Sequence, residues 1–368
     1  MPAPRTFLGL ILLLQGAVSG LGAPASAQSS YPGHEWQWIN EGERILWSAS
    51  LLKQAHAYSD SIHSSSVMIV QDGKIVDAWG SLDQKISSFS VRKSLISALY
   101  GIYVDEGSID PNATLADLGI DDAPDRLTAI EKQAKVLDLL RSRSGVYHPV
   151  DFETKAQIAT RPDRNSHAPG TFWFYNNWDF NALGTIFETR THLSIGNAFY
   201  ERIAAPIGMQ DFNPGDVYYM PGPESIHRAY HFEITARDLA RFGLLYLNHG
   251  RWRERQIIPA AWVDKSSHAS EMVVFGGVNS GGYEYLWWVE VDGVHFSGIA
   301  VPPGTYSARG AGGHMLVVIP AKRLVIVHRF DNEPSNHEVA TVIAAAYRGI
   351  TNAQFSPLLK LILDAAPP

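Results

Sequence analysis

The sequence contains two places where a serine stands three residues before a lysine. Ser90 precedes Lys93 in "FSVRKSLIS", and Ser50 precedes Lys53 in "SASLLKQ". On a helix, side chains at this spacing lie on one face, one turn apart. A serine hydroxyl becomes a nucleophile when a neighbouring base takes its proton, and a lysine whose pKa is lowered by burial or by nearby positive charge can be that base. Both pairs therefore have the residue types for nucleophilic catalysis.

The surroundings of the two pairs differ. Ser50 lies inside a helical pattern of ordinary packing residues, with Lys53 free to reach solvent. Ser90 follows the polar stretch "SLDQKISSF" and precedes the apolar run from Leu95 to Val104, which predicts that a helix begins at Ser90. Unpaired N–H groups and the helix dipole favour a developing negative charge there. We predict that Ser90 is the nucleophile; a serine that only caps the helix is the alternative.

A second candidate pair is Tyr175 and Asn177 in "PGTFWFYNN". It falls in an aromatic-rich loop ahead of a helix predicted to begin near Asn181, and loops on rigid elements often carry catalytic groups. Tyr246 and Asn248 have the same spacing, but they fall near the end of an amphipathic helix, where a tyrosine is more often part of the core. The third candidate element is "GTYSARGAGGHMLVVIP", whose small residues would let a substrate approach the backbone of an edge strand. An N–H group of that strand would then complete an oxyanion hole with the N–H of Ser90.

These elements need a scaffold, and the sequence predicts one from its two ends. A helical spacing over 45–55 is followed by "SSSVMIVQDGKIVDAWG", a hairpin that turns at Asp72-Gly73. A second hairpin, "HMLVVIPAKRLVIVHRF", and two helical segments close the chain, while the intervening part is mostly helix and loop. We predict a sheet lobe from about 40–89 and 283–368, an inserted helical lobe from about 90–282, and a site in the cleft between them.

Composition excludes several classes of function. The chain has 368 residues, of which 45% are hydrophobic and 18% charged, as expected of a globular protein. The net charge of −7 comes with no basic cluster, which argues against a nucleic-acid partner, and zero cysteines exclude thiol catalysis and disulfides. His227 and His231 are four apart, but no third ligand is indicated, so we expect neither a metal nor a cofactor. The pattern Gly-x-Ser-x-Gly is absent, which argues against an α/β-hydrolase.

The first residues have the pattern of an export signal. Arg5 is followed by an apolar run from Phe7 to Leu14 and by small residues that end at Ala25-Ser26-Ala27. We expect cleavage after Ala27, which would leave 28–368 as a periplasmic or secreted domain. The apolar run is too short for a permanent membrane span, and no later segment is a candidate.

The three elements, in this order, resemble the serine hydrolases related to class C β-lactamases, which include penicillin-binding carboxypeptidases, esterases and 6-aminohexanoate-dimer hydrolases. The resemblance runs from about Glu43 to Ile350 and is carried by "FSVRKS", "PGTFWFYNN" and "ARGAGGH", with support from "LLRSRSGV", "APIGMQD" and "ITARDLARFGLLYLNHGRW". It implies an α+β, β-lactamase-like (transpeptidase-like) fold, an antiparallel sheet flanked by helices from both chain ends plus an inserted helical lobe.

The resemblance also implies roles for individual residues. Ser90 would be the acylated nucleophile and Lys93 its proton acceptor. Tyr175 would act as a general base and acid with its pKa lowered by positive charge, and Asn177 would bind near the substrate. The strand N–H would be that of Ala311, or next that of Ala308. Water would then hydrolyse the acyl-enzyme.

One motif of the penicillin-recognising relatives is missing. Their Lys-Thr-Gly or His-Thr-Gly triplet is replaced here by "TYSARGAGGH", where Arg309 or His314 would have to supply the positive charge. This loss favours a small ester or amide substrate and the 6-aminohexanoate-dimer hydrolase branch. A β-lactamase or D-alanyl-D-alanine carboxypeptidase is the alternative, and a binding or sensing protein without turnover is a second one. The oligomeric state is left open.

Several aromatic residues fall near the motifs. Tyr147 and His148, in the loop "SGVYHPVDFE", are predicted to line the substrate pocket. Trp173, Trp287 and Trp288 could also line it, but packing in the core is the favoured explanation for each large aromatic side chain.

Overall fold

Strands from both ends of the chain join in one antiparallel sheet. The computed structural model describes residues 1–2, 30–332 and 339–368, so the expected signal segment lies almost wholly outside the described residues. The seven strands of the sheet follow the order β10-β11-β12-β13-β14-β1-β2, and neighbouring strands are antiparallel. Their bounds are β1 (Ser66–Gln71), β2 (Lys74–Gly80), β10 (Gly282–Glu284), β11 (Trp287–Val289), β12 (Tyr306–Gly310), β13 (His314–Ile319) and β14 (Leu324–Arg329).

The two chain ends meet where β1 pairs with β14, with Ile69 opposite Ile326. The turn between β1 and β2 is made by Asp72 and Gly73, whose φ angles are +49° and +80°. Positive φ at both positions is the reason that Asp-Gly is favoured in tight hairpins. The predicted first hairpin and the sheet built from both chain ends are confirmed.

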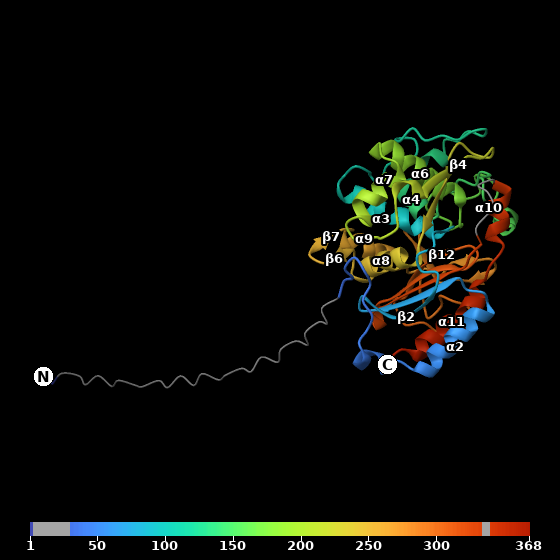
Figure 1. The fold of residues 1–368 in the computed structure, drawn as a ribbon. Helices are drawn as coiled ribbons and strands as arrows, with labels where there is room; N and C mark the ends of the chain where they lie inside the picture. The colour runs from blue at the N-terminus through green and yellow to red at the C-terminus, as the bar shows by residue number, and fades with distance from the viewer. Residues whose placement is uncertain (3–29, 333–338) are drawn as a thin grey trace.

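Helices cover both faces of the sheet (Figure 1). On one face, α2 (Ala49–Ser61) packs against α11 (Asn352–Ala365). Leu52 of α2 and Phe355 of α11 share a buried apolar cluster with Ile69 and Ile326 of the sheet. Burial of these β-branched strand residues under apolar helix faces stabilises this side of the sheet.

The other face is covered by α8 (Ala236–Leu247), which contacts β1, β13 and β14. Gly243 permits this contact, because a Cβ there would lie 2.5 Å from Val325 Cγ1 and 2.6 Å from Leu316 Cδ1. This segment was predicted to belong to the inserted helical lobe. In the structure α8 instead packs on the sheet, because nearly all of its residues are buried and its apolar face needs a large apolar surface to cover it.

The remaining elements lie mainly beyond this sheet. They are α1 (Glu41–Arg44), β3 (Ile86–Ser87), α3 (Val91–Asp105), α4 (Val136–Leu140), α5 (Lys155–Thr160), α6 (Asn177–Thr191), α7 (Ile195–Phe199), β4 (Val217–Met220), β5 (Ala229–Ile234), β6 (Arg251–Trp252), β7 (Arg255–Gln256), α9 (Ala260–Ser266), β8 (Val274–Phe275), β9 (Val278–Asn279) and α10 (Val339–Ala346). Among the described residues, no helix is both long and apolar enough to cross a bilayer.

Helix α3 is buried along most of its length, from Val91 to Tyr103. It contacts β12 and β13 of the large sheet as well as α6, α7 and β5 of the helical region. These contacts place α3 at the junction of the two regions, so a residue at its first turn faces the space between them.

Candidate active site

Ser90 is the N-cap residue of α3, as predicted, but its side chain makes no capping hydrogen bond. Its φ and ψ of −74° and −7° are already helical, and the preceding Phe89 has a φ of +46°. Such a φ in a bulky residue costs on the order of 1–3 kcal/mol and persists only where the surroundings impose it. The hydroxyl is therefore not used to close the helix and remains available for chemistry.

Lys93 lies one turn further along α3 and is 2% exposed. Its Nζ is 2.7 Å from Ser90 Oγ and 2.9 Å from the hydroxyl of Tyr175, and it lies 4.5 Å from the ring centroid of Phe180. Burial lowers the pKa of Lys93 well below its ordinary value, and the positive charge of Arg92 lowers that pKa further. An uncharged amine can accept the serine proton, which is what a general base must do.

The second serine–lysine pair lies elsewhere. Ser50 and Lys53 are exposed on α2, on the far face of the sheet, and the Ser50 hydroxyl contacts Ser48 Oγ at 3.2 Å. Neither residue belongs to the lining of the pocket next to Ser90. Of the two pairs, Ser90 and Lys93 therefore line the pocket, and Ser50 and Lys53 do not.

Tyr175 is 8% exposed, and its hydroxyl hydrogen-bonds with Lys93 and Ser90. Burial raises the pKa of Tyr175 to about 12, although the hydrogen bond with Ser90 and the charges of Arg92 and Arg309 act in the opposite direction. The predicted lowering of this pKa is wrong, because loss of solvation outweighs the nearby positive charge. Tyr175 is thus a neutral phenol that can pass a proton on.

Asn177 begins α6, four residues earlier than the predicted helix start near Asn181. The Asn176 side chain caps the helix by accepting a bond from Trp178 N at 3.1 Å. The Asn177 Nδ2 donates to Phe152 O at 2.9 Å, while its buried Oδ1 has no hydrogen-bond partner among the described residues. A buried acceptor without a partner is costly, and this one belongs to a residue of the pocket wall.

The glycine-rich element brings β12 against the segment before Ser90. A Cβ on Gly310 would lie 2.5 Å from Ser88 O, so only glycine permits this approach. Ala311 follows directly and lines the same pocket as Ser90. In the part of the chain that the structure describes, the N–H groups of Ser90 and Ala311 donate to no acceptor. Ala308, the other candidate, lies fully buried inside β12 and not in the pocket wall.

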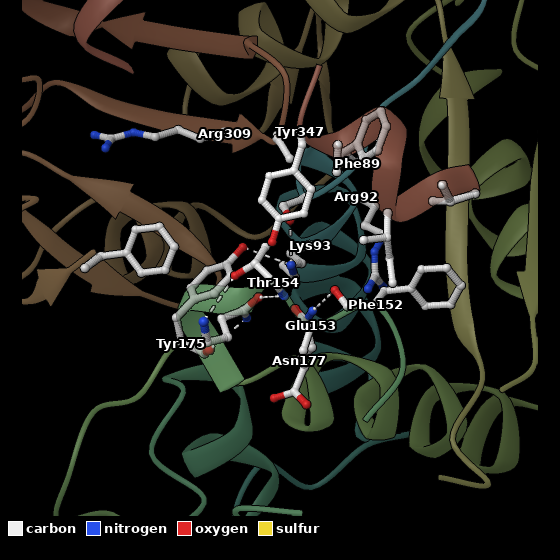
Figure 2. A pocket seen from close by; sticks show the side chains of 18 of the residues that line it. Phe89, Arg92, Lys93, Phe152, Glu153, Thr154, Tyr175, Asn177, Arg309 and Tyr347 are labelled. Atoms are coloured by element: carbon white, nitrogen blue, oxygen red, sulfur yellow. Dashed lines mark hydrogen bonds between the residues drawn. The ribbon is translucent and has the colours of Figure 1, made fainter. Parts of the chain in front are cut away.

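The two candidate cations of this element are both engaged elsewhere. The Arg309 guanidinium donates to His295 O at 2.8 Å and to Ser307 Oγ at 2.9 Å, and Figure 2 shows it turned away from Lys93 and Tyr175. His314 is fully buried next to Asn332, and burial lowers its pKa well below the ordinary value. Arg309 lines the pocket but directs its guanidinium toward His295, and His314 does not belong to the lining.

A cavity of about 240 Å³ opens at Ser90 (Figure 2). Its walls include aromatic and aliphatic side chains from four separate segments: Phe152, Phe275, Trp288, Val342, Ile343 and Tyr347. The ring of Tyr175 lies 5.0 Å from that of Phe275 and is stacked 5.6 Å from that of Trp288. The pocket is largely apolar around a small polar centre, which is typical of sites for small molecules.

Sequence reasoning found Trp288 but missed Phe152, Phe275 and the residues of α10. Phe275 lies in the β8–β9 hairpin, whose glycine pair in "VFGGVN" indicates a turn and says nothing about its place in the fold. Helix α10 follows the last strand, and its Val342 reaches the pocket through packing against Phe89. No local pattern in the sequence encodes these contacts.

Tyr147 and His148 do not line the pocket, contrary to the prediction. The Tyr147 ring packs edge-on against Phe174 and is 4% exposed. His148 is 3% exposed and lies between two carboxylates, with Asp122 Oδ2 at 3.2 Å and Glu131 Oε1 at 3.4 Å. A buried imidazole between two carboxylates is paired with opposite charge inside the fold, so this loop anchors the helical region.

The other candidate aromatics divide between core and site. Trp287 is fully buried, 4.4 Å from the ring of Tyr246, which confirms that Tyr246 belongs to the core. Trp173 lies behind the pocket wall, 6.2 Å from Trp288.

The two histidines considered as metal ligands differ in their surroundings: His231 lines the pocket, whereas His227 contacts Thr185. Within residues 30–332 and 339–368, no group of His, Asp and Glu is arranged to hold a metal ion.

A comparison with family models places most of this chain in one family. The model described as Beta-lactamase matches residues 49–347, so the chain belongs to the β-lactamase family of hydrolases. No curated protein matches significantly. The fold and the arrangement of serine, lysine and tyrosine agree with the resemblance found in the sequence.

Solved structures show the same fold at low identity. A candidate 6-aminohexanoate-dimer hydrolase from Bacillus anthracis is 21% identical with a TM-score of 0.61, over 91% of this chain and 89% of that one. A penicillin-binding protein homologue from Caulobacter crescentus is 15% identical with a TM-score of 0.58, over 85% and 98%. A family VIII carboxylesterase is 18% identical with a TM-score of 0.54, over 81% and 96%.

Proposed function

We propose that this protein is an exported serine hydrolase that cleaves a small ester or amide through an acyl-enzyme at Ser90. The observation that carries the proposal is the position of the buried Lys93 amine, within hydrogen-bonding distance of both Ser90 and Tyr175. A base beside the nucleophile and a second proton carrier beside the base are the groups that acyl transfer needs.

In the first half of the reaction, Ser90 Oγ attacks the carbonyl carbon and its proton passes to the Lys93 amine. The carbonyl oxygen becomes an oxyanion, which the N–H groups of Ser90 and Ala311 are available to bind. The bond to the leaving group then breaks. Tyr175 gives its proton to the leaving oxygen or nitrogen and regains one from the Lys93 ammonium.

In the second half, water attacks the acyl-enzyme and passes a proton to the same pair of residues. The carboxylic acid leaves, and Ser90 Oγ recovers its proton from Lys93. No net proton is gained or lost by the protein. Asn177 lines the pocket, and in this proposal its side-chain amide would contact the bound substrate.

The pocket favours an ester or amide over a β-lactam. A β-lactam or a D-alanyl peptide carries a carboxylate, whereas the Arg309 guanidinium is turned toward His295 and His314 is fully buried with a lowered pKa. The apolar wall formed by Phe152, Phe275 and Trp288 suits an uncharged acyl group. β-Lactamase or carboxypeptidase activity is therefore the secondary candidate.

A substrate panel tests the reaction. Wild type and Ser90→Ala are assayed with short and long acyl esters, linear amides, D-alanyl peptides and a chromogenic cephalosporin. We expect turnover of an ester or linear amide by the wild type alone. Fast cephalosporin hydrolysis would favour the β-lactamase alternative. A stable acyl-enzyme without repeated turnover, seen by intact-protein mass spectrometry, would favour the binding or sensing alternative.

Export is proposed from the order of residues at the start of the chain, with one cation, an apolar run and a small-x-small site at Ala25-Ser26-Ala27. N-terminal sequencing of the exported protein should begin at Gln28. A protein that retains Met1 outside the cytoplasm would contradict the proposal.

A further inference from the structure

Two consecutive basic residues of α3 contact two consecutive residues of α6. The Arg92 Nη2 donates to Asn181 Oδ1 at 3.1 Å, and the Lys93 Nζ lies 4.5 Å from the ring centroid of Phe180. Both basic residues also line the pocket at Ser90. The mechanism above uses Lys93 and gives Arg92 no part.

Arg92 is buried without a compensating carboxylate. It is 4% exposed, its guanidinium lies 4.3 Å from the ring centroid of Tyr230, and its Nη1 has no hydrogen-bond partner among the described residues. Within those residues, Arg92 hydrogen-bonds with Asn181, and Lys93 with Ser90 and Tyr175, and none of these partners is a carboxylate. An unpaired buried charge destabilises a fold, and an apolar side chain of similar size would be more favourable at such a position. Stability therefore does not explain this arginine.

We propose that Arg92 is a positioning residue of the proposed hydrolase: Asn181 and Tyr230 hold its guanidinium at the pocket that Lys93 also lines, so that Lys93 enters the reaction as an uncharged amine. The inference rests on the proposed function of Lys93 as the base for Ser90. A fixed like charge disfavours a second positive charge nearby, and this effect is strong where water is excluded. The contacts with Asn181 and Tyr230 hold the charge in place without neutralising it, since one partner is an amide and the other a ring.

The charged and titratable groups on the other elements around Lys93 do not replace the effect of the Arg92 charge on the protonation of Lys93. Tyr175, Tyr230 of β5 and Tyr283 of β10 are buried phenols, and burial raises the pKa of each. Arg309 of β12 is a second cation, but its guanidinium is turned toward His295.

Three other titratable side chains line the pocket: Glu153, His231 and Tyr347, whose hydroxyl accepts a hydrogen bond from Lys155 N. Glu153, between α4 and α5, is the one carboxylate among the residues that line it, and it pairs with Arg161. His231 of β5 packs its ring against Phe152. Arg92 is thus the charge that most directly opposes protonation of Lys93, in agreement with its part in lowering the Lys93 pKa after burial.

The pH dependence of kcat/KM tests the proposal on the full-length protein with an ester that the wild type hydrolyses. In Arg92→Met the positive charge is lost, so the pKa of Lys93 rises. We expect the acid limb of the profile to move up by about one pH unit or more. At a pH below that limb, kcat/KM should fall about tenfold, and activity should recover at higher pH. Arg92→Lys keeps a charge and should hold the limb near its wild-type position.

A second variant guards against poor folding of Arg92→Met. Asn181→Asp has nearly the same size as the wild type and places a carboxylate 3.1 Å from the guanidinium, so it neutralises Arg92 in place. It should move the acid limb in the same direction. The matched control is Arg202→Met, which removes an arginine paired with Glu106 at the other end of α3 and should leave the limb unmoved.

The outcomes separate this inference from the proposed function. If Arg92→Met and Asn181→Asp fold, by circular dichroism, and lower activity equally at every pH, Arg92 is only structural and the proposal is overturned. A limb that moves to lower pH also overturns it. If the wild type forms no acyl-enzyme at Ser90, the proposed function itself is wrong. That result is obtained without the pH profiles, so the two failures can be told apart.

Discussion

The amine of Lys93 lies 2.9 Å from the hydroxyl of Tyr175, and the pKa values of the two groups are shifted in opposite directions. Burial and Arg92 lower the pKa of Lys93 well below its ordinary value, while burial raises that of Tyr175 to about 12. The lowered pKa of Lys93 favours the uncharged amine, and the raised pKa of Tyr175 favours the neutral phenol. The pair therefore favours lysine as the acceptor of the Ser90 proton and tyrosine as the carrier between lysine and leaving group.

Removal of the tyrosine hydroxyl tests this division of roles. Tyr175→Phe keeps the ring that packs on Phe275 and Trp288 but loses the proton carrier. Because general acid–base groups contribute about 10²- to 10⁴-fold, we expect kcat to fall by about that factor while the protein stays folded. Tyr246→Phe is the matched control, since Tyr246 lies in the core next to Trp287; steady-state kinetics should give near-wild-type values. Equal activity of Tyr175→Phe and wild type would contradict the assigned role.

Lys93 determines the sign of the pH dependence. The base acts only when uncharged, so activity should rise as pH passes upward through the lowered pKa of Lys93, well below the 10.5 of an ordinary lysine. Lys93→Arg replaces the amine by a guanidinium that stays protonated. We expect it to lose acylation at every pH, as measured by the burst of leaving group. An active Lys93→Arg variant would show that the base lies elsewhere.

Gly310 tests the close approach of β12 to the nucleophile. In Gly310→Ala the new Cβ would lie 2.5 Å from Ser88 O, so the backbone at Ser90 or Ala311 must move. Displacement of an oxyanion donor costs about 10²-fold or more in rate, and we expect kcat to fall more than KM rises. Gly215→Ala is the control, because a Cβ there meets no atom within 4 Å. An unchanged kcat in Gly310→Ala would rule out the predicted oxyanion hole.

The buried His148 predicts a pH dependence of stability. Burial lowers the pKa of His148, but its bonds to Asp122 and Glu131 outweigh burial and raise the pKa to about 9. A folded-state pKa above the unfolded value of 6.5 gives a stabilisation that is complete below pH 6.5 and is lost as pH rises through about 9. The free energy of unfolding, from urea denaturation, should fall over this window by on the order of 1–3 kcal/mol.

His148→Gln removes the titrating group and should abolish that part of the pH dependence. Because His148 does not line the pocket, the folded variant should retain kcat. A variant whose stability still falls between pH 6.5 and 9 as in the wild type would assign the effect to another group.

The sequence predicted the scaffold and the centre of the site well, because both are encoded locally. Two apolar strand segments with Asp72-Gly73 between them predicted a hairpin, and a polar stretch before an apolar run predicted the helix start at Ser90. Ser90 and Lys93 are one helical turn apart, so their side chains lie close together however the helix packs in the fold.

Features that depend on tertiary packing were not predictable in this way. The pKa of Tyr175 depends on how much water the fold excludes, and sequence cannot report burial. Tyr147 and His148 follow a motif-like loop, yet Asp122 and Glu131 draw the histidine into the interior. Phe275 and Val342 reach the pocket from segments far apart in the chain.

The most direct test of the central claim is covalent labelling by a fluorophosphonate probe, followed by intact-protein mass spectrometry and peptide mapping. We predict a single adduct on Ser90 in the wild type and in Ser50→Ala, and none in Ser90→Ala. Lys93→Met should react far more slowly than wild type. An adduct on Ser50, or ester turnover that persists in Ser90→Ala, would contradict the account.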